Sequence, residues 1–197
     1  NRPGELMPIF EDEHGTYIMN SKDLRAIQHI ERLTKIGIDS LKIEGRTKSV
    51  YYVARTAQIY RRAIDDALAG QKFDPTLIAK LDNLANRGYT DGFYQRHPTQ
   101  EQQNYIQGYS TSDRQQYVGE ITGYDVENQA LDIDVKNKFS VGDKLELILP
   151  EGNVDLVLEQ MKNKDGKAID VAPGSGHQVK VPYLGKIPKQ GLLARYI

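Results

Sequence analysis

The spacing of apolar residues divides the chain into two halves with different periodicities. In the second half, apolar and polar residues alternate over residues 131–136 and again over residues 144–149. A period of two is typical of β-strands that bury one face. About seven short strands at this spacing predict a small all-β barrel or a β-sandwich. The remaining strands are expected at residues 117–122, 154–160, 168–171, 178–181 and 192–196, with turn residues between them.

The first half shows the three-to-four-residue spacing that is typical of helices. Helices are expected over residues 22–35, 50–69 and 75–85, and a short strand over residues 16–19. Residues 1–14 contain two prolines and an acidic group, which predict an irregular connecting segment.

One stretch in this half combines three signals. Leu41 and Ile43 alternate with Lys42 and Glu44, Gly45 breaks the run, and Ser49 stands at the N-cap position of the long helix. A strand, a tight turn and a helix form the repeating unit of α/β sheets and barrels. In such folds the chemistry collects at the carboxyl ends of the strands.

The charged residues at this predicted strand end are the candidate site: Lys42, Glu44, Arg46 and Lys48. Arginine and lysine there would hold a carboxylate or a phosphate, arginine in a bidentate manner, while Glu44 would accept a proton or orient Arg46. The arrangement describes an anion-binding site better than a full catalytic apparatus. An ordinary surface turn with solvated charges remains the alternative. Arg55, two helical turns further on, stays open between the two interpretations.

Composition excludes several classes of function. Lys and Arg number 26 against 27 Asp and Glu, which argues against a purely electrostatic nucleic-acid binder. The chain has no cysteine, so it offers no disulfide, no thiol nucleophile and no thiolate ligand. Its 4 histidines lie far apart and none forms a helical pair suited to zinc. No apolar run approaches the roughly 18 residues of a membrane span, so we expect a cytoplasmic protein without bound metal in this part.

The polar stretch at residues 96–115 is rich in Gln and Ser and predicts a linker. It would separate a first part, residues 1–95, from a β-barrel part, residues 116–197. The expected fold class is therefore α+β in two parts. Because the chain opens with Asn1 in what looks like a loop, we expect it to be a piece of a longer protein.

The chain resembles the collagenase-like peptidase U32 family, and within it the bacterial branch of tRNA hydroxylation proteins. The resemblance rests on SLKIEGRTKS at residues 40–49, YYVA at 51–54, YIMNSKDL at 17–24, RGYTDGF at 87–93 and VKNKFSVGD at 135–143. It implies that residues 15–70 are the last β/α units of a TIM-like α/β barrel. It also implies that the region from about residue 115 is the family's C-terminal β-barrel.

Members of this branch are associated with prephenate-dependent formation of 5-hydroxyuridine at the tRNA wobble position and with an iron–sulfur cluster held by cysteines. The resemblance thus implies tRNA as a partner, prephenate as cosubstrate and cluster ligands upstream of these residues. This chain departs from some relatives, which have a cysteine in the stretch where it carries Arg25 and Val53, and from the methionine that is usual at Thr47. Any cluster must therefore be held wholly by upstream residues, or be absent.

Three functions follow as hypotheses. In the first, the chain is part of an RNA-modifying enzyme, with Glu44 and Arg46 as catalytic residues and with Lys42, Lys48, Tyr51 and Arg55 as substrate-binding residues. Its β-barrel would grip RNA through Lys136, Lys138 and Lys144, for which plain solvation is the alternative. The second hypothesis is a collagenase-like peptidase, although no recognisable nucleophile or acid pair supports it. The third is a non-catalytic RNA- or protein-binding module, which is what we expect of these residues in isolation.

Overall fold

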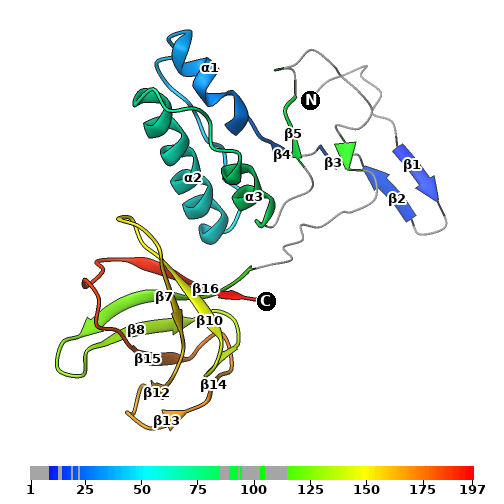
Figure 1. Ribbon diagram of the computed structural model, residues 1–197. Helices are drawn as coiled ribbons and strands as arrows, with labels where there is room; N and C mark the ends of the chain where they lie inside the picture. The colour runs from blue at the N-terminus through cyan, green and yellow to red at the C-terminus, as the bar shows by residue number, and fades with distance from the viewer. Residues whose placement is uncertain are drawn as a thin grey trace. The chain divides into compact units, whose positions relative to one another are not determined.

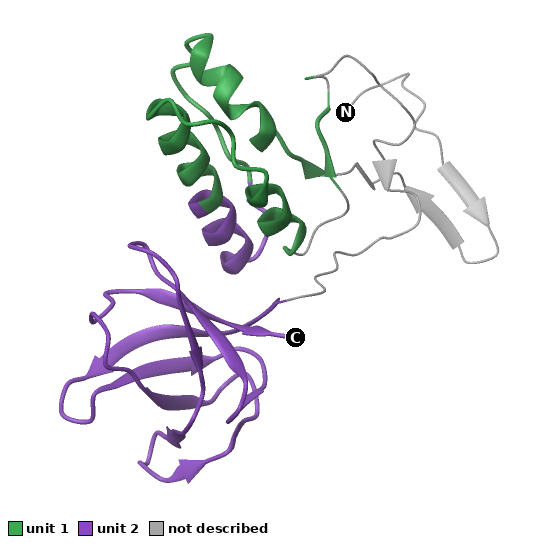
Figure 2. Cartoon of the chain, viewed as in Figure 1, with its two compact units in different colours: residues 1–44, 59–112 green, residues 45–58, 113–197 purple. Residues whose placement is uncertain are grey.

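The computed structural model describes residues 9–12, 15–18, 20–21, 23–84, 89–92, 94, 103–104 and 115–197. The chain forms two compact units, shown in different colours in Figure 2. Unit 1 comprises Asn1–Glu44 and Ile59–Ser112, and unit 2 comprises Gly45–Gln58 and Asp113–Ile197. The boundary between the units therefore falls within one helix as well as in the polar region before the sheet.

Unit 1 contains short helices and pairs of very short strands (Figure 1). The helical elements are η1 (Ile27–His29), α1 (Ile30–Lys35), the second part of α2 (Val50–Leu68) and α3 (Thr76–Asp82). The strands pair as β1 (Ile9–Asp12) with β2 (Gly15–Ile18), β3 (Asn20–Ser21) with β6 (Gln103–Asn104), and β4 (Asp23–Leu24) with β5 (Tyr89–Thr90), the last pair being parallel.

Apolar side chains from η1, α1, α2 and α3 form the core of this unit. The buried ones are Ile27, Ile30, Ile59, Ala63, Leu77, Leu81 and Leu84. Tyr60 on α2 accepts a hydrogen bond at its hydroxyl from the backbone N–H of Ala26, at 2.9 Å, which fixes the chain entering η1 against the helix. At the other end of α2, Gly70 adopts a φ of +73°, the left-handed conformation that commonly terminates helices.

The helices expected at residues 50–69 and 75–85 are confirmed as α2 and α3, with shorter ends. The helix expected at residues 22–35 begins later, because Asp23 and Leu24 pair with β5 instead. The irregular segment expected at residues 1–14 is wrong at Ile9–Asp12, which forms strand β1 against β2; the other residues of that segment lie outside the described part.

The strand expected at residues 38–43 is not formed. Ile38, Leu41 and Ile43 lie in an irregular connection and are 46%, 36% and 42% exposed. An alternating pattern produces a strand only where another strand satisfies the backbone N–H and C=O groups. Within the described residues no strand pairs with this segment.

Unit 2 is an antiparallel sheet of eight strands that curls around its own core (Figure 1). The strand order is β11-β10-β16-β7-β8-β15-β12-β13. These strands are β7 (Gln115–Asp125), β8 (Ala130–Val135), β10 (Lys144–Ile148), β11 (Val154–Val157), β12 (Met161–Asn163), β13 (Ala168–Ile169), β15 (Gln178–Pro182) and β16 (Gly191–Tyr196). A separate pair joins β9 (Phe139–Ser140) to β14 (Val171–Ala172).

The inner face of the sheet carries one continuous apolar cluster. It includes Val118, Leu131, Ile133, Phe139, Leu145, Leu147, Met161, Val179, Val181 and Leu193. Alternation along β8 and β15 places their apolar side chains in this cluster and their polar side chains outside, as the pattern predicts. The strands expected in this half are confirmed with altered ends, except that residues 168–171 contribute to two short strands, β13 and β14, which pair with different partners. Strands β9 and β12 were not predicted.

Among the described residues, no helix has both the length and the apolar character that a membrane crossing requires.

Candidate functional site

The charged segment before α2 ends in a capped turn. The hydroxyl of Ser49 accepts a hydrogen bond from the backbone N–H of Tyr52 at 3.1 Å, which confirms the predicted N-cap. The N–H of Lys48 donates to the carbonyl of Gly45 at 2.9 Å and closes the preceding turn. A Cβ atom at Gly45 would lie 2.8 Å from Cγ2 of Val53, so the close approach of turn and helix requires glycine. Turn, cap and helix are thus confirmed here, although the preceding strand is not.

The four charged side chains of the candidate site fall into two pairs. Lys42 and Glu44 belong to unit 1, where the ammonium lies 3.8 Å from a carboxylate oxygen and the side chains are 85% and 67% exposed. Arg46 and Lys48 belong to unit 2, where Lys48 lies 4.8 Å from the ring centroid of Tyr52 and Arg46 is exposed. Charges this exposed are well solvated and contribute little to stability. They remain accessible to an anionic ligand.

A buried polar network in unit 2 joins the first half of α2 to the sheet. The guanidinium of Arg55 donates to Glu146 at 3.1 Å and to Gln115 at 3.1 Å. The side-chain amide of Gln115 donates in turn to Glu146 at 2.7 Å, and that of Asn153 donates to Glu146 at 2.6 Å. Arg55, Glu146 and Gln115 are all buried. A charge pair removed from water in this way needs further hydrogen bonds, and Glu146 accepts them from the amides of Gln115 and Asn153. Arg55 donates to the side-chain oxygen of Gln115, although Nε of Arg55 is buried without a partner among the described residues.

Arg55 and Tyr51, both predicted to bind substrate, face this network. The Tyr51 hydroxyl donates to Gln115 at 3.1 Å, and its ring stacks on Tyr117 with 5.6 Å between centroids. Burial raises the pKa of Tyr51, which keeps the phenol neutral and able to donate. The structure gives both residues a packing role within unit 2, and their surroundings offer no support for a contact with substrate.

The buried role of Glu146 was not identified from the sequence. Glu146 stands between Leu145 and Leu147 in an alternating pattern, which predicts a solvated side chain. In the structure, the residues of β10 after Lys144 are buried on both faces of the strand. The first half of α2 belongs to the same unit and covers the outer face through the Arg55 network. The available signal was Ile148, which breaks the alternation and makes an apolar run with its neighbours.

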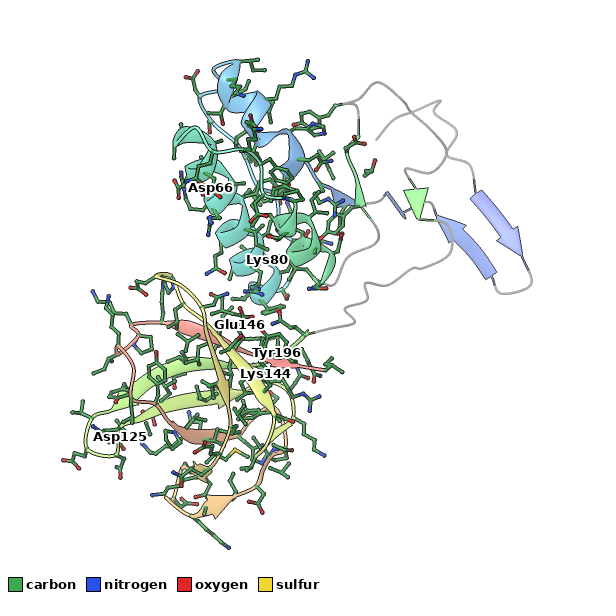
Figure 3. All side chains as sticks on the ribbon, in the orientation of Figure 1. Asp66, Lys80, Asp125, Lys144, Glu146 and Tyr196 are labelled. Atoms are coloured by element: carbon green, nitrogen blue, oxygen red, sulfur yellow. The ribbon has the colours of Figure 1, made fainter. Side chains whose placement is uncertain are left out.

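Two of the three lysines predicted to bind RNA are engaged by carboxylates. Lys136 lies 2.8 Å from Asp134 and 3.2 Å from Glu120, and these hydrogen bonds raise the pKa of Lys136. Lys144 lies 4.7 Å from the ring centroid of Tyr196 and 3.9 Å from a carboxylate oxygen of Asp155 (Figure 3).

The third of these lysines, Lys138, is exposed in the turn between β8 and β9. Within the described residues the structure gives Lys138 no ionic partner. Of the predicted RNA-binding lysines it is therefore the one whose charge stays uncompensated.

Neither unit offers the ligands that a redox centre of the expected kind would need. In the part of the chain that the structure describes, no group of three or more His, Asp or Glu residues could hold a metal ion. His29 stacks on Tyr94 with 5.0 Å between centroids and lies 3.7 Å from Asp91. The sequence also contains no cysteine, so these residues do not fit an iron–sulfur cluster.

Comparison with known proteins gives matches along almost the whole chain. The family described as peptidase family U32 matches residues 2–104, and the family described as peptidase family U32 C-terminal domain matches residues 113–195. The chain is 62% identical over 181 residues to "tRNA hydroxylation protein P" of Escherichia coli, covering 92% of this chain and 40% of that protein. It is 57% identical over 178 residues to the protein of the same name from Haemophilus influenzae, covering 90% of this chain and 39% of that protein.

A more distant relative is a "Collagenase" of Porphyromonas gingivalis, 24% identical over 190 residues, covering 94% of this chain and 52% of that protein. The chain thus spans about 40% of the length of the curated relatives that it matches at the higher identities. With one family description matching the first half and its C-terminal counterpart matching the second, the chain belongs to peptidase family U32.

Proposed function

We propose that the protein acts in tRNA hydroxylation, converting the wobble uridine to 5-hydroxyuridine in a prephenate-dependent reaction. The observation that carries this proposal is the 62% identity, across 92% of the chain, to a protein named for tRNA hydroxylation. Identity at this level extends over both units rather than a single motif. The site of action would be the cytoplasm, and the partner would be tRNA.

Deleting the gene is expected to remove 5-hydroxyuridine and its derivatives from tRNA. The measurement is mass spectrometry of nucleosides from purified tRNA, with a strain that carries the gene on a plasmid as the matched control. Loss in the deletion strain and recovery with the plasmid are expected. Unchanged tRNA in the deletion strain would contradict the proposed function.

The residues before α2 would bind the anionic cosubstrate. Prephenate carries two carboxylates, for which Arg46 is the strongest candidate because guanidinium binds carboxylate in a bidentate manner. Lys42 and Lys48 would add positive charge, and Glu44 would orient Arg46 or accept a proton. Exposure of Arg46 and of the Lys42–Glu44 pair supports a role in binding rather than in folding.

Replacing Arg46 with alanine is expected to weaken prephenate binding by at least about 1.5 kcal/mol, a roughly 12-fold rise in Kd, because a charge-assisted hydrogen bond is lost. Isothermal titration calorimetry of prephenate into the complete gene product measures the effect. Arg32→Ala is the matched control, since Arg32 is exposed on α1 and has no proposed contact with ligand. If the Arg46 variant binds prephenate as tightly as the unsubstituted protein does, Arg46 is a solvated residue of an ordinary surface turn and not a ligand contact.

Residues 15–70 would complete an α/β barrel together with a part of the protein outside this chain, and unit 2 would be a β-barrel. The exposed apolar side chains of Ile38, Leu41 and Ile43 support the first point, since a complete α/β barrel would bury apolar side chains of its strands in its interior or beneath its helices. Any iron–sulfur cluster would be held outside these residues, because they contain no thiolate. The isolated 197 residues would then bind without catalysing hydroxylation.

A second candidate function is peptide hydrolysis, which the relative named collagenase favours. Gelatin cleavage by the purified complete gene product distinguishes the two functions. Cleavage together with unchanged tRNA in the deletion strain would replace hydroxylation by hydrolysis.

A further inference from the structure

The basic side chains of unit 2 differ in whether a carboxylate neutralises them. On the strands β8, β15 and β16, Lys136, Lys180 and Arg195 are each paired with an aspartate. The hairpin of β12 and β13, residues 161–169, is different. Its Lys162, Lys164 and Lys167 are exposed, and the described residues provide no ion pair to any of them. The lone acidic residue within this hairpin, Asp165, leaves it with a net positive charge.

Lys162 on β12 lies directly opposite Lys180 on β15. The ammonium of Lys180 is held by Asp125 and Asp132, each at 2.9 Å, and the bond to Lys180 lowers the pKa of Asp125. Because two carboxylates neutralise Lys180, its charge does not count against that of Lys162. Lys162 is exposed, so its ammonium is accessible to an anionic ligand.

A polar hollow lies beside the hairpin. Its lining is Lys164, Gln178, Lys180, Val179, Thr122 and Asp132. Lys164 and the amide of Gln178 supply donors, and Lys180 has one N–H beyond the two that its aspartates accept. Asp132 supplies an acceptor. This mixture suits a sugar–phosphate unit better than a simple anion, because phosphate needs donors whereas a ribose 2′-hydroxyl can donate to a carboxylate.

We propose that the β12–β13 hairpin, with the hollow beside it, binds the sugar–phosphate backbone of tRNA (the hairpin is labelled in Figure 1). This inference rests on the proposed function for the identity of the RNA. It assigns the RNA contact to residues other than Lys136 and Lys144, because these two lysines already form ion pairs with Asp134 and Asp155. Contacts of this kind position an RNA without reading its sequence.

The test compares two triple variants of the complete gene product that change the net charge equally. The first replaces Lys162, Lys164 and Lys167 with glutamine. The matched control replaces three exposed lysines elsewhere in the chain with glutamine: Lys80, Lys186 and Lys189. Affinity for unmodified tRNA is measured by filter binding at several salt concentrations. The hairpin variant is expected to bind about tenfold more weakly, with a log–log salt slope shallower by about 2, because three phosphate contacts are lost.

The control variant is expected to keep the affinity and slope of the unsubstituted protein. Lys162→Gln alone changes an exposed side chain, so it should leave the unfolding midpoint nearly unchanged while still weakening binding, which separates a folding defect from a lost contact. Equal losses in both triple variants, or no loss in the hairpin variant, would overturn the inference.

The two proposals fail in different ways. If the hairpin variant binds tRNA normally while gene deletion still removes 5-hydroxyuridine, the hairpin inference is wrong and the proposed function stands. If the hairpin variant loses tRNA binding while deletion leaves tRNA unchanged, the binding surface stands and the hydroxylation function is wrong.

Discussion

Replacing Arg55 with alanine is expected to lower the free energy of unfolding of unit 2 by about 3–5 kcal/mol, the cost of leaving a buried charge without its partner. The substitution leaves the carboxylate of Glu146 buried beside Gln115 and Asn153, whose amides supply hydrogen bonds but no positive charge. Urea denaturation followed by tyrosine fluorescence measures the effect, since the chain has 12 tyrosines and no tryptophan.

Two controls separate this effect from the loss of any arginine on α2. Arg61→Ala removes an exposed i,i+4 pair with Asp65 on the same helix and is expected to lower the free energy of unfolding far less than Arg55→Ala does. The double variant Arg55→Met, Glu146→Leu replaces the ion pair with apolar side chains and is expected to recover most of the loss, to within about 1 kcal/mol of the unsubstituted protein. If Arg55→Ala is as mild as Arg61→Ala, the network does not hold α2 against the sheet.

Replacing Phe139 with alanine is expected to destabilise unit 2 by about 3–5 kcal/mol, the sum of lost apolar burial and a cavity. Phe139 is fully buried at 0% exposure in the apolar cluster of the sheet, and Ala172 stands opposite it on β14. An alanine pair at this position would leave the space of the ring unfilled. The same urea titration measures the change.

The matched control for Phe139 is Val157→Ala on β11, where the side chain is 58% exposed. Its cost is expected to stay within about 0.5 kcal/mol, as for most surface substitutions. A cost below about 1 kcal/mol for Phe139→Ala would mean that neighbouring side chains close over the space, or that β9 does not pack on the core.

Elements that depend on local signals could be predicted from the sequence. The cap at Ser49 and the helix that follows it are encoded within a few neighbouring residues, so both were predicted correctly. The strands β8 and β15 were predicted for a similar reason, since a one-sided alternation of five or six residues leaves little ambiguity. In each case the signal lies within a few consecutive residues, and the partner that a strand also needs is present, since β8 and β15 pair with each other.

Elements that depend on distant partners could not be predicted. Strand β9 has only two residues, too few for any period, and exists because β14 pairs with it. The segment at residues 38–43 has the period of a strand, but without a paired neighbour it stays irregular.

In the candidate site, too, contacts between sequence neighbours could be predicted and contacts with distant residues could not. Sequence order placed Lys42 near Glu44 correctly. It could not show that the guanidinium of Arg55 would be hydrogen-bonded to Glu146, which is 91 residues away in the sequence. Nor could it show that Lys180 would meet Asp125 and Asp132, because that depends on register across strands.

The segment Gly45–Gln58, which contains the first half of α2, has a practical consequence for work on the second half of the chain. The C-terminal family description begins at residue 113, and an expression boundary drawn there would omit this segment. The truncated product would present the outer side of β10 to solvent and would leave Glu146 lacking its cation. Preparing the sheet in its native surroundings therefore requires a fusion or co-expressed peptide that supplies the start of α2.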